Sequence, residues 1–324
     1  MKVPPLPAGA VVRSSDPYVT VEAETVDAFL TALSPLTGFG AHGDFIYRGQ
    51  GNSSWGLVPT SRRKSAWPAP MMMVFQERSL SESLRDTWRN RLLSEVGTLL
   101  SFYRIADRQG LPVPNGTNLR MELMWLMTDL NRGLTKDVLK RWPSREVAPA
   151  LALAQHYGLP TCLLDFTWSP YVAAYFAARG CMDGRDTEDG HLCVWIVGDT
   201  ELTSLHDSPS RGIHLLVPPA SDNRTLQTQE GLLMWLPLFP FGAACASVTD
   251  LDEDYQQNEG FERVLSSDSP ETSVMKLILP KKAAKALLRA LIRLGYDSSR
   301  LFPTFDGAAR AVREHGWAEI RPRW

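Results

Sequence analysis

Three short segments of this chain carry side chains that could bind or transform a ligand. The first is residues 45–50 (FIYRGQ), in which Arg48 follows a run of β-forming residues. The planar guanidinium of Arg48 can bind a phosphate or a carboxylate, and Gly49 would let a ligand approach the backbone closely. A surface arginine before a turn would give the same pattern, so this segment alone leaves both interpretations open.

The second segment is residues 155–170 (QHYGLPTCLLDFTWSP), which leads from the end of one predicted helix to the start of the next. Alternation along a strand would place Asp165, Thr167 and Ser169 on one side, offering a carboxylate and two hydroxyls to a ligand. His156 precedes them at the end of the first helix. The alternative is structural: Ser169 caps the following helix, Asp165 pairs with an arginine, and His156 bonds a backbone carbonyl.

The third segment is residues 224–231 (RTLQTQEG), a predicted turn ahead of an apolar strand. A carboxylate at this turn could polarise a ribose hydroxyl or stabilise a developing cation. Gln229 and Glu230 are both candidates, because a slip of one residue in a strand or turn exchanges the side chains that face a site. A solvated turn would explain the same residues.

Composition limits the classes of protein to which the chain can belong. The chain has 324 residues, of which 44% are hydrophobic and 22% charged, which is enough to bury a substantial core. It has no apolar run long enough to span a membrane, and its first residues lack the apolar core of a secretion signal. The four cysteines lack Cys-x-x-Cys spacing and the six histidines lack metal-ligand spacing, so we expect no metal, reduced thiols and a cytoplasmic location.

The charge is distributed unevenly along the chain. Residues 60–145 carry 15 Lys/Arg against 8 Asp/Glu, a local balance of +7 within a chain of net charge -2. A basic stretch of helices could meet an anionic ligand or nucleic acid. A solvated helical face with an incidental bias is the other interpretation.

Apolar periodicity predicts an α+β fold with helices concentrated early and strands late. Helices are expected at 21–36, 74–107, 119–142, 144–157, 171–179, 281–294 and 308–314, and strands at 44–49, 191–197, 234–238 and 274–279. The acidic stretch 249–271 is expected to be a loop. We therefore divide the chain into a lead-in and helix (1–40), a main domain (41–315) with a helical subdomain at about 74–157, and a tail (316–324).

The three segments, in this order, resemble the FRG domain family, which is named for its Phe/Tyr-Arg-Gly signature. The similar blocks are Tyr47–Gln50 for the signature, Gln155–Ser169 for the family's Gln-His-Tyr-Gly-Leu-Pro-Thr-Arg-Leu-Leu-Asp block, Asn223–Gly231 for its Gln-Gly turn, and Leu301–Gly307 for its C-terminal element. Three positions depart from the pattern: Cys162 stands where it has Arg, Phe166 where Trp is usual, and Glu230 where a second Gln is common. No phosphate contact is expected from position 162.

The FRG domain is in turn distantly similar to the ADP-ribosyltransferase fold. This resemblance implies an ADP-ribosyltransferase-like β core with a large helical insertion, and NAD as a substrate. By it, Arg48 would bind the pyrophosphate and Glu230 (or Gln229) would stabilise the positive charge on the ribose. The other expected binding residues are Tyr47, Gly49, Gln50, His156, Asp165, Thr167 and Ser169, with Trp168 or Tyr47 available to stack on nicotinamide.

Two classes of function follow from these observations. The first is an NAD-dependent ADP-ribosyltransferase or NAD glycohydrolase, by analogy a bacterial toxin or phage-defence effector, with an unidentified protein or nucleic-acid acceptor. The second is a non-catalytic module that binds a nucleotide or nucleic acid through the same pocket and the basic helices 60–145. Turnover of NAD separates the first from the second, and a steep salt dependence would indicate nucleic acid.

Overall fold

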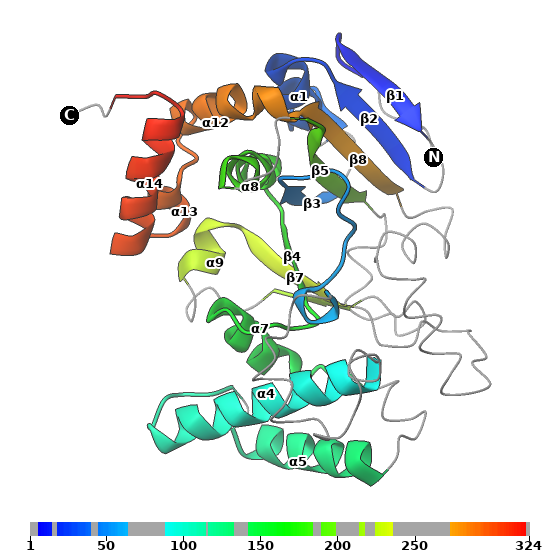
Figure 1. Cartoon of the computed structure of the whole chain (residues 1–324), viewed down its shortest axis with the longest axis vertical. Coiled ribbons are helices and arrows are strands. Elements are labelled where there is room, and N and C mark those ends of the chain that lie inside the picture. The colour runs from blue at the N-terminus through cyan, green and yellow to red at the C-terminus, as the bar shows by residue number, and fades with distance from the viewer. Residues whose placement is uncertain are drawn as a thin grey trace.

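The computed structural model describes residues 6–14, 18–39, 45–63, 88–114, 116–132, 142–183, 189–198, 214–217, 224–235 and 273–321. These residues form a mixed α+β fold built on an eight-stranded sheet (Figure 1). The strands are β1 (Ala10–Ser14), β2 (Val19–Ala23), β3 (Phe45–Gln50), β4 (Leu164–Thr167), β5 (His191–Gly198), β6 (His214–Leu216), β7 (Gly231–Trp235) and β8 (Ser273–Pro280). The predicted α+β class is therefore confirmed.

The order of strands across the sheet is β1-β2-β8-β5-β3-β4-β7-β6, so neighbours in space come from distant parts of the chain. Strand β3 pairs with β5 along its whole length, from Phe45 opposite Gly198 to Gln50 opposite Cys193. On its other side β3 meets β4 at a single pair, Tyr47 opposite Thr167. Beyond that pair the two strands part, so the sheet is divided into a large half ending at β3 and a small half beginning at β4.

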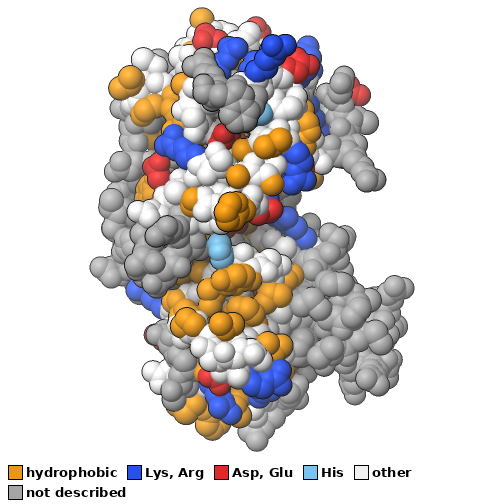
Figure 2. Space-filling view, turned by 90° about the vertical axis from the view of Figure 1, so that its left-hand side faces the viewer, with side chains coloured by type: hydrophobic (Ala, Val, Ile, Leu, Met, Phe, Trp, Pro, Cys, Tyr) orange, Lys and Arg blue, Asp and Glu red, His pale blue; other side chains and the backbone are white. Residues whose placement is uncertain are grey.

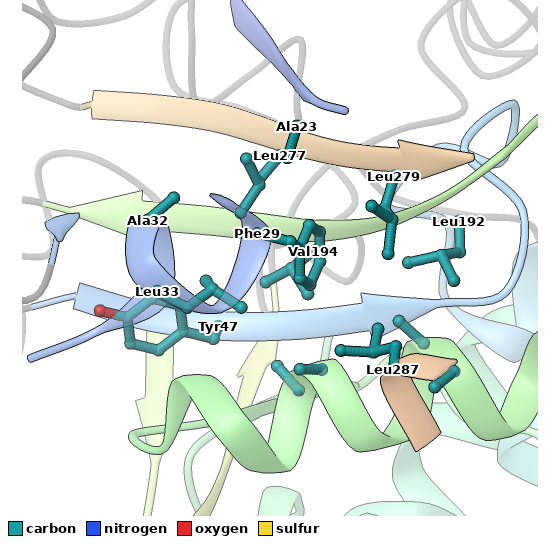
Figure 3. Packing of buried hydrophobic residues seen from close by; sticks show 14 of the residues in the cluster. Ala23, Phe29, Ala32, Leu33, Tyr47, Leu192, Val194, Leu277, Leu279 and Leu287 are labelled. Atoms are coloured by element: carbon teal, nitrogen blue, oxygen red, sulfur yellow. The ribbon is translucent and has the colours of Figure 1, made fainter. Parts of the chain in front are cut away.

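Helices cover one face of the large half of the sheet. They are α1 (Val26–Leu33), α8 (Pro170–Asp183) and α12 (Ala284–Arg293), and alternate residues of β5, β3 and β8 point toward them. Figure 3 shows this packing, with Tyr47, Val194 and Leu277 from the strands meeting Phe29 and Leu33 of α1 and Leu287 of α12. Burial of one such leucine or phenylalanine contributes roughly 1.5–3 kcal/mol, so this core fixes the position of β3.

A second core holds the helical part of the chain against the small half of the sheet. Helices α4 (Trp88–Arg108), α5 (Gly116–Arg132) and α7 (Ala148–His156) pack on Leu163, Leu233 and Trp235. The apolar residues expected to form the inner face of the helix at 74–107 are all buried: Leu92, Leu93, Val96, Leu99, Leu100 and Tyr103. The helix predicted at 74–107 is confirmed from residue 88 onward, and residues 74–87 lie outside the described part of the chain.

Hydrophobic side chains also gather on the face shown in Figure 2, which looks onto the side of the molecule where α7 and the α4–α5 connection lie. The exposed apolar side chains of this helical part are Ile105, Leu111, Met121, Met124, Trp125 and Tyr157.

None of the described helices is long and apolar enough to cross a bilayer.

Two predicted boundaries were wrong. The helix expected at 21–36 begins only at Val26, because Val19, Val21 and Ala23 alternate inward along β2 and Thr25 caps the helix by accepting a hydrogen bond from the amide of Ala28. The strand expected at 234–238 is β7, which begins at Gly231; residues 236–238 and the acidic stretch 249–271 lie outside the described residues.

The remaining elements follow the prediction closely. Strands β5 and β8 and helix α8, which opens on Pro170, match their expected ranges to within a few residues. The chain closes with α12, preceded by a 3-10 turn (Lys281–Ala283), then α13 (Ser298–Leu301) and α14 (Phe305–Trp317). A short helix, α9 (Arg224–Thr228), leads into β7.

Candidate functional site

A cavity of about 390 Å³ lies where β3 and β4 part. It is lined by residues of all three segments singled out in the sequence: Tyr47, Arg48, Gly49, Gln50, Asp165, Thr167 and Gln229. Further lining residues come from the loop after β3 (Trp55, Arg63), from α8 (Ala173, Phe176, Gly180) and from the C-terminal part of the chain (Phe302). Residues far apart in sequence therefore converge on one pocket.

Arg48 is the central cation of the pocket. Its side chain is only 15% exposed, and its Nη1 donates to the backbone oxygen of Asp165 at 2.6 Å. The Nε–H of Arg48 is buried and has no hydrogen-bond partner within the part of the chain that the structure describes. Burial lowers the pKa of Arg48, and the nearby Asp165 carboxylate opposes this shift, so the group stays charged. A buried donor without a partner is a ready contact for an anion.

Asp165 lies beside Arg48 but faces solvent, with a side chain that is 64% exposed. Its Oδ1 accepts a hydrogen bond from Nε2 of Gln155 at 2.6 Å. Gln155 is held in turn by the hydroxyl of Thr161, which donates to its Oε1. Arg63, exposed at the rim, is a second cation whose charge interacts with Asp165.

Gly49 has a structural role in addition to the expected one. A Cβ at Gly49 would lie 1.8 Å from the backbone oxygen of Ala173, because helix α8 crosses β3 at this point. Gly51 faces the same helix, with a Cβ position 2.5 Å from the backbone of Gly180 and Cys181. The glycine is therefore required for the contact between helix and strand. It also lines the cavity, so the close approach of a ligand at Gly49 stays a prediction.

Gln50 and Tyr47 line the pocket and also belong to its framework. The Oε1 of Gln50 accepts from the indole of Trp195 at 2.8 Å, and its Nε2 donates to the backbone oxygen of Gly56 at 3.1 Å. The amide thus holds the loop that carries Trp55. Burial raises the pKa of Tyr47 to about 12, so its hydroxyl is neutral at physiological pH.

The two predicted hydroxyls act at the junction of β4 with α8. Thr167 Oγ1 donates to the backbone oxygen of Gln229 at 2.7 Å and accepts from the amide of Ser169 at 2.9 Å. Ser169 is buried, and its backbone oxygen accepts from the amide of Ala173 in the first turn of α8. Thr167 therefore joins two of the three segments, while Ser169 is not among the residues that line the cavity.

The third segment places its two candidate residues differently. Gln229 lies on the cavity wall, and its Nε2 donates to the backbone oxygen of Leu301 at 3.2 Å. Glu230 is exposed, is not among the lining residues, and has a φ of 48°, a left-handed conformation uncommon outside glycine. Its backbone oxygen accepts from the amide of Trp168 at 3.0 Å.

His156 and Trp168 are not brought to the cavity wall. His156 is exposed at the end of α7, with its ring edge-on to that of Tyr157 at 5.2 Å between centroids. Trp168 is 41% exposed just after β4. Trp55, Phe176 and Phe302 line the pocket instead and offer aromatic surfaces for stacking. The rings of Phe176 and Phe302 pack edge-to-face, with 6.2 Å between their centroids.

Sequence reasoning assigned no binding role to five residues of the site: Gln155, Trp55, Arg63, Phe176 and Phe302. Gln155 and Phe302 lie within two of the blocks that carry the family resemblance, and this was the available signal. Trp55 and Phe176 follow the blocks Tyr47–Gln50 and Gln155–Ser169 by several residues. Arg63 carried none beyond its place in a basic cluster (Arg62-Arg63-Lys64).

Position 162, where this chain departs from the family pattern, lies away from the cavity. Cys162 is buried in the second core, and its amide donates to the buried carboxyl of Glu95, which also accepts from the indole of Trp142. Burial raises the pKa of both the Cys162 thiol and the Glu95 carboxyl. The cysteine at position 162 therefore affects the packing around α4, and it is not among the residues that line the pocket.

Comparison with known proteins agrees with one of the four sequence blocks, Gln155–Ser169. Residues 101–185 match the model of the FRG domain, a range that contains α7, β4 and α8 and thus one wall of the cavity. A search of the curated proteins gave no match, and a search of the solved structures gave none. The block from Gln155 to Ser169 lies inside this range, so residues 101–185 of the chain are similar to the FRG domain.

Proposed function

We propose that the pocket binds NAD and that the protein is an ADP-ribosyltransferase or an NAD glycohydrolase. One observation carries the proposal: a single pocket combines a buried guanidinium that has an unpartnered donor with several aromatic side chains, among them Trp55, Phe176 and Phe302. A nucleotide presents the complementary groups, a phosphate for the cation and flat rings for the aromatic surfaces.

The size of the cavity is consistent with this substrate class. Small-molecule sites enclose roughly 300–1,000 Å³, and a cavity of about 390 Å³ lies near the lower end of that range. We infer that it encloses one half of the dinucleotide.

The proposed roles follow from charge. Arg48 would bind the phosphates through its free Nε–H. Cleavage of the bond between nicotinamide and ribose builds positive charge on the sugar, as in glycoside cleavage. Glu230, which adjoins Gln229 of the cavity wall, would stabilise that charge, and Tyr47 or Phe176 would contact the nicotinamide ring. The resemblance to the ADP-ribosyltransferase core is supported by the meeting of β3, the β4–α8 junction and the turn before β7 at one pocket.

Release of nicotinamide from NAD tests the proposal. We expect the purified protein to release nicotinamide, and Glu230→Gln to lower the turnover by about 100- to 1,000-fold, the usual cost of removing one charge-stabilising group. Arg48→Ala should raise the NAD concentration needed for half-maximal rate. Cell extract is added in parallel as a source of a protein or nucleic-acid acceptor, and radiolabel transfer distinguishes transferase from glycohydrolase.

Glu24→Gln serves as the matched control, because Glu24 is an exposed carboxylate at the start of α1, remote in sequence from the pocket segments. Equal losses in Glu24→Gln and Glu230→Gln would contradict a specific role for Glu230. Absence of both nicotinamide release and NAD binding would contradict the proposal as a whole.

A second candidate function, binding without catalysis, is favoured by the internal contacts of the pocket. The Thr167 hydroxyl and the Gln229 amide both donate to backbone oxygens and so serve the framework of the pocket. Among the described lining residues, Asp165 alone carries a carboxylate. Such a module would bind NAD or another nucleotide and release no nicotinamide. A nucleic-acid ligand held by the basic helices would instead lose affinity steeply with added salt.

A further inference from the structure

Two residues outside the cavity lining, Gln155 and Thr161, fix the position of the Asp165 carboxylate. The hydroxyl of Thr161 donates to Oε1 of Gln155, which leaves the Nε2 of Gln155 to point at Asp165. Nε2 then donates to Oδ1 of Asp165 at 2.6 Å. The Thr161 contact fixes which end of the amide faces the carboxylate, so Gln155 presents a donor to it.

This arrangement keeps the carboxylate just outside hydrogen-bonding range of Arg48. The other oxygen, Oδ2, lies 3.8 Å from Nη1 of Arg48, which is too long for a hydrogen bond. The Nε–H of Arg48 meanwhile has no partner within the described residues. A carboxylate this close to a guanidinium that has one unsatisfied donor would ordinarily turn toward it, because a carboxylate bonds an ionised donor more strongly than a neutral amide.

We propose that Gln155 is a positioning residue that holds Asp165 away from Arg48 and thereby keeps the anion site of the pocket open. The proposal rests on the proposed function in one respect, that Arg48 is the phosphate-binding group. Without the Gln155 contact, Asp165 rotates onto the Nε–H of Arg48. A phosphate must then displace an internal carboxylate before it can bind.

Titration calorimetry with ADP-ribose, a probe that carries the pyrophosphate and cannot release nicotinamide, measures the effect. Gln155→Leu should weaken binding by roughly tenfold, since the ligand now competes with a charge-assisted bond. Asp165→Asn added to that variant should restore the affinity, and Asp165→Asn alone should not weaken it. A merely structural role for Gln155 predicts a loss that the second substitution cannot repair.

Gln155→Glu is the second variant, in case leucine perturbs the end of α7. It keeps the size of the side chain and the acceptor for Thr161 but removes the donor and repels Asp165. It should therefore weaken binding at least as much as Gln155→Leu, with the same rescue by Asp165→Asn. Affinity that is unchanged in both variants would overturn the inference.

A ligand-free readout separates this inference from the proposed function. In NMR spectra, the Nε–H of Arg48 should exchange with solvent more slowly in Gln155→Leu, because it gains a partner, and should revert in the double variant. If the wild-type protein binds neither NAD nor ADP-ribose, the proposed function fails while this measurement still decides the role of Gln155. Unchanged exchange in Gln155→Leu would overturn the proposal whatever the ligand.

Discussion

Gly49→Ala should destabilise the protein by about 3 kcal/mol or more, or prevent it from folding, although it adds a single methyl group. The new Cβ would lie 1.8 Å from the backbone oxygen of Ala173 and 2.7 Å from the amide of Ala177. Both neighbours are main-chain atoms of a buried helix, so α8 must move as a unit. Thermal unfolding followed by circular dichroism measures the effect, and loss of α8 packing would also open the pocket wall that carries Phe176.

Gly316→Ala is the matched control for this substitution. Gly316 lies in the last turn of α14, where an added Cβ meets nothing within 4 Å. Alanine is the better helix former, so this variant should be more stable by about 0.5–1 kcal/mol. A Gly49→Ala protein as stable as the wild type would show that α8 does not pack on β3 as described.

The second large effect is expected at Glu314, a fully buried carboxylate that joins α8 to the C-terminal helices. It accepts hydrogen bonds from the hydroxyl of Tyr175 at 2.7 Å, from the amide of Ser298 at 2.9 Å and from the Ser298 hydroxyl, and Nε of Arg179 lies 3.1 Å away. Burial raises the pKa of Tyr175, which keeps its hydroxyl protonated as a donor. Glu314→Ala removes the acceptor of these three hydrogen bonds and the buried carboxylate beside Arg179.

We expect Glu314→Ala to cost about 3–5 kcal/mol of unfolding free energy in a urea titration. The change should also reach the pocket, because α13 ends at Leu301, whose backbone oxygen holds Gln229, and is followed by Phe302. Glu319→Ala, two residues beyond the end of the same helix, is the control: its carboxylate is exposed and pairs with Lys285 and Arg289, so little change is expected. Equal losses in the two variants would argue against the buried network.

Much of the pocket was predictable because its residues stand at the ends of strongly patterned elements. Tyr47, Arg48, Asp165 and Thr167 follow apolar runs typical of buried strands, and β3 and β4 do meet, at Tyr47 and Thr167. The contact between Arg48 and Asp165 spans 117 positions in the sequence. No local period encodes which strand lies beside which, so this pairing required the resemblance to the FRG blocks or the structure itself.

The features that the sequence did not reveal share a physical cause. A glycine after a strand gives the same pattern whether a ligand or a helix lies over it, and Gly49 faces Ala173 of α8 as well as the cavity. Residues 21–25 were predicted as the start of the helix that follows, yet Val21 and Glu22 pair with β8. The backbone at Glu230 is left-handed, which no rule for a non-glycine residue predicts. In each case a partner distant in sequence outweighs the local preference.

The place of β8 in the sheet has a consequence for the order in which the protein folds during synthesis. Strand β8 lies between β2 and β5, parallel to the first and antiparallel to the second, yet it follows the other seven strands of the described residues in sequence. On the ribosome, at roughly 5–20 residues per second, β2 and β5 must wait with unpaired edges until residues 273–280 emerge. A nascent chain arrested after β7 would therefore present two open edges, the exposed state in which edge-to-edge aggregation and chaperone capture occur.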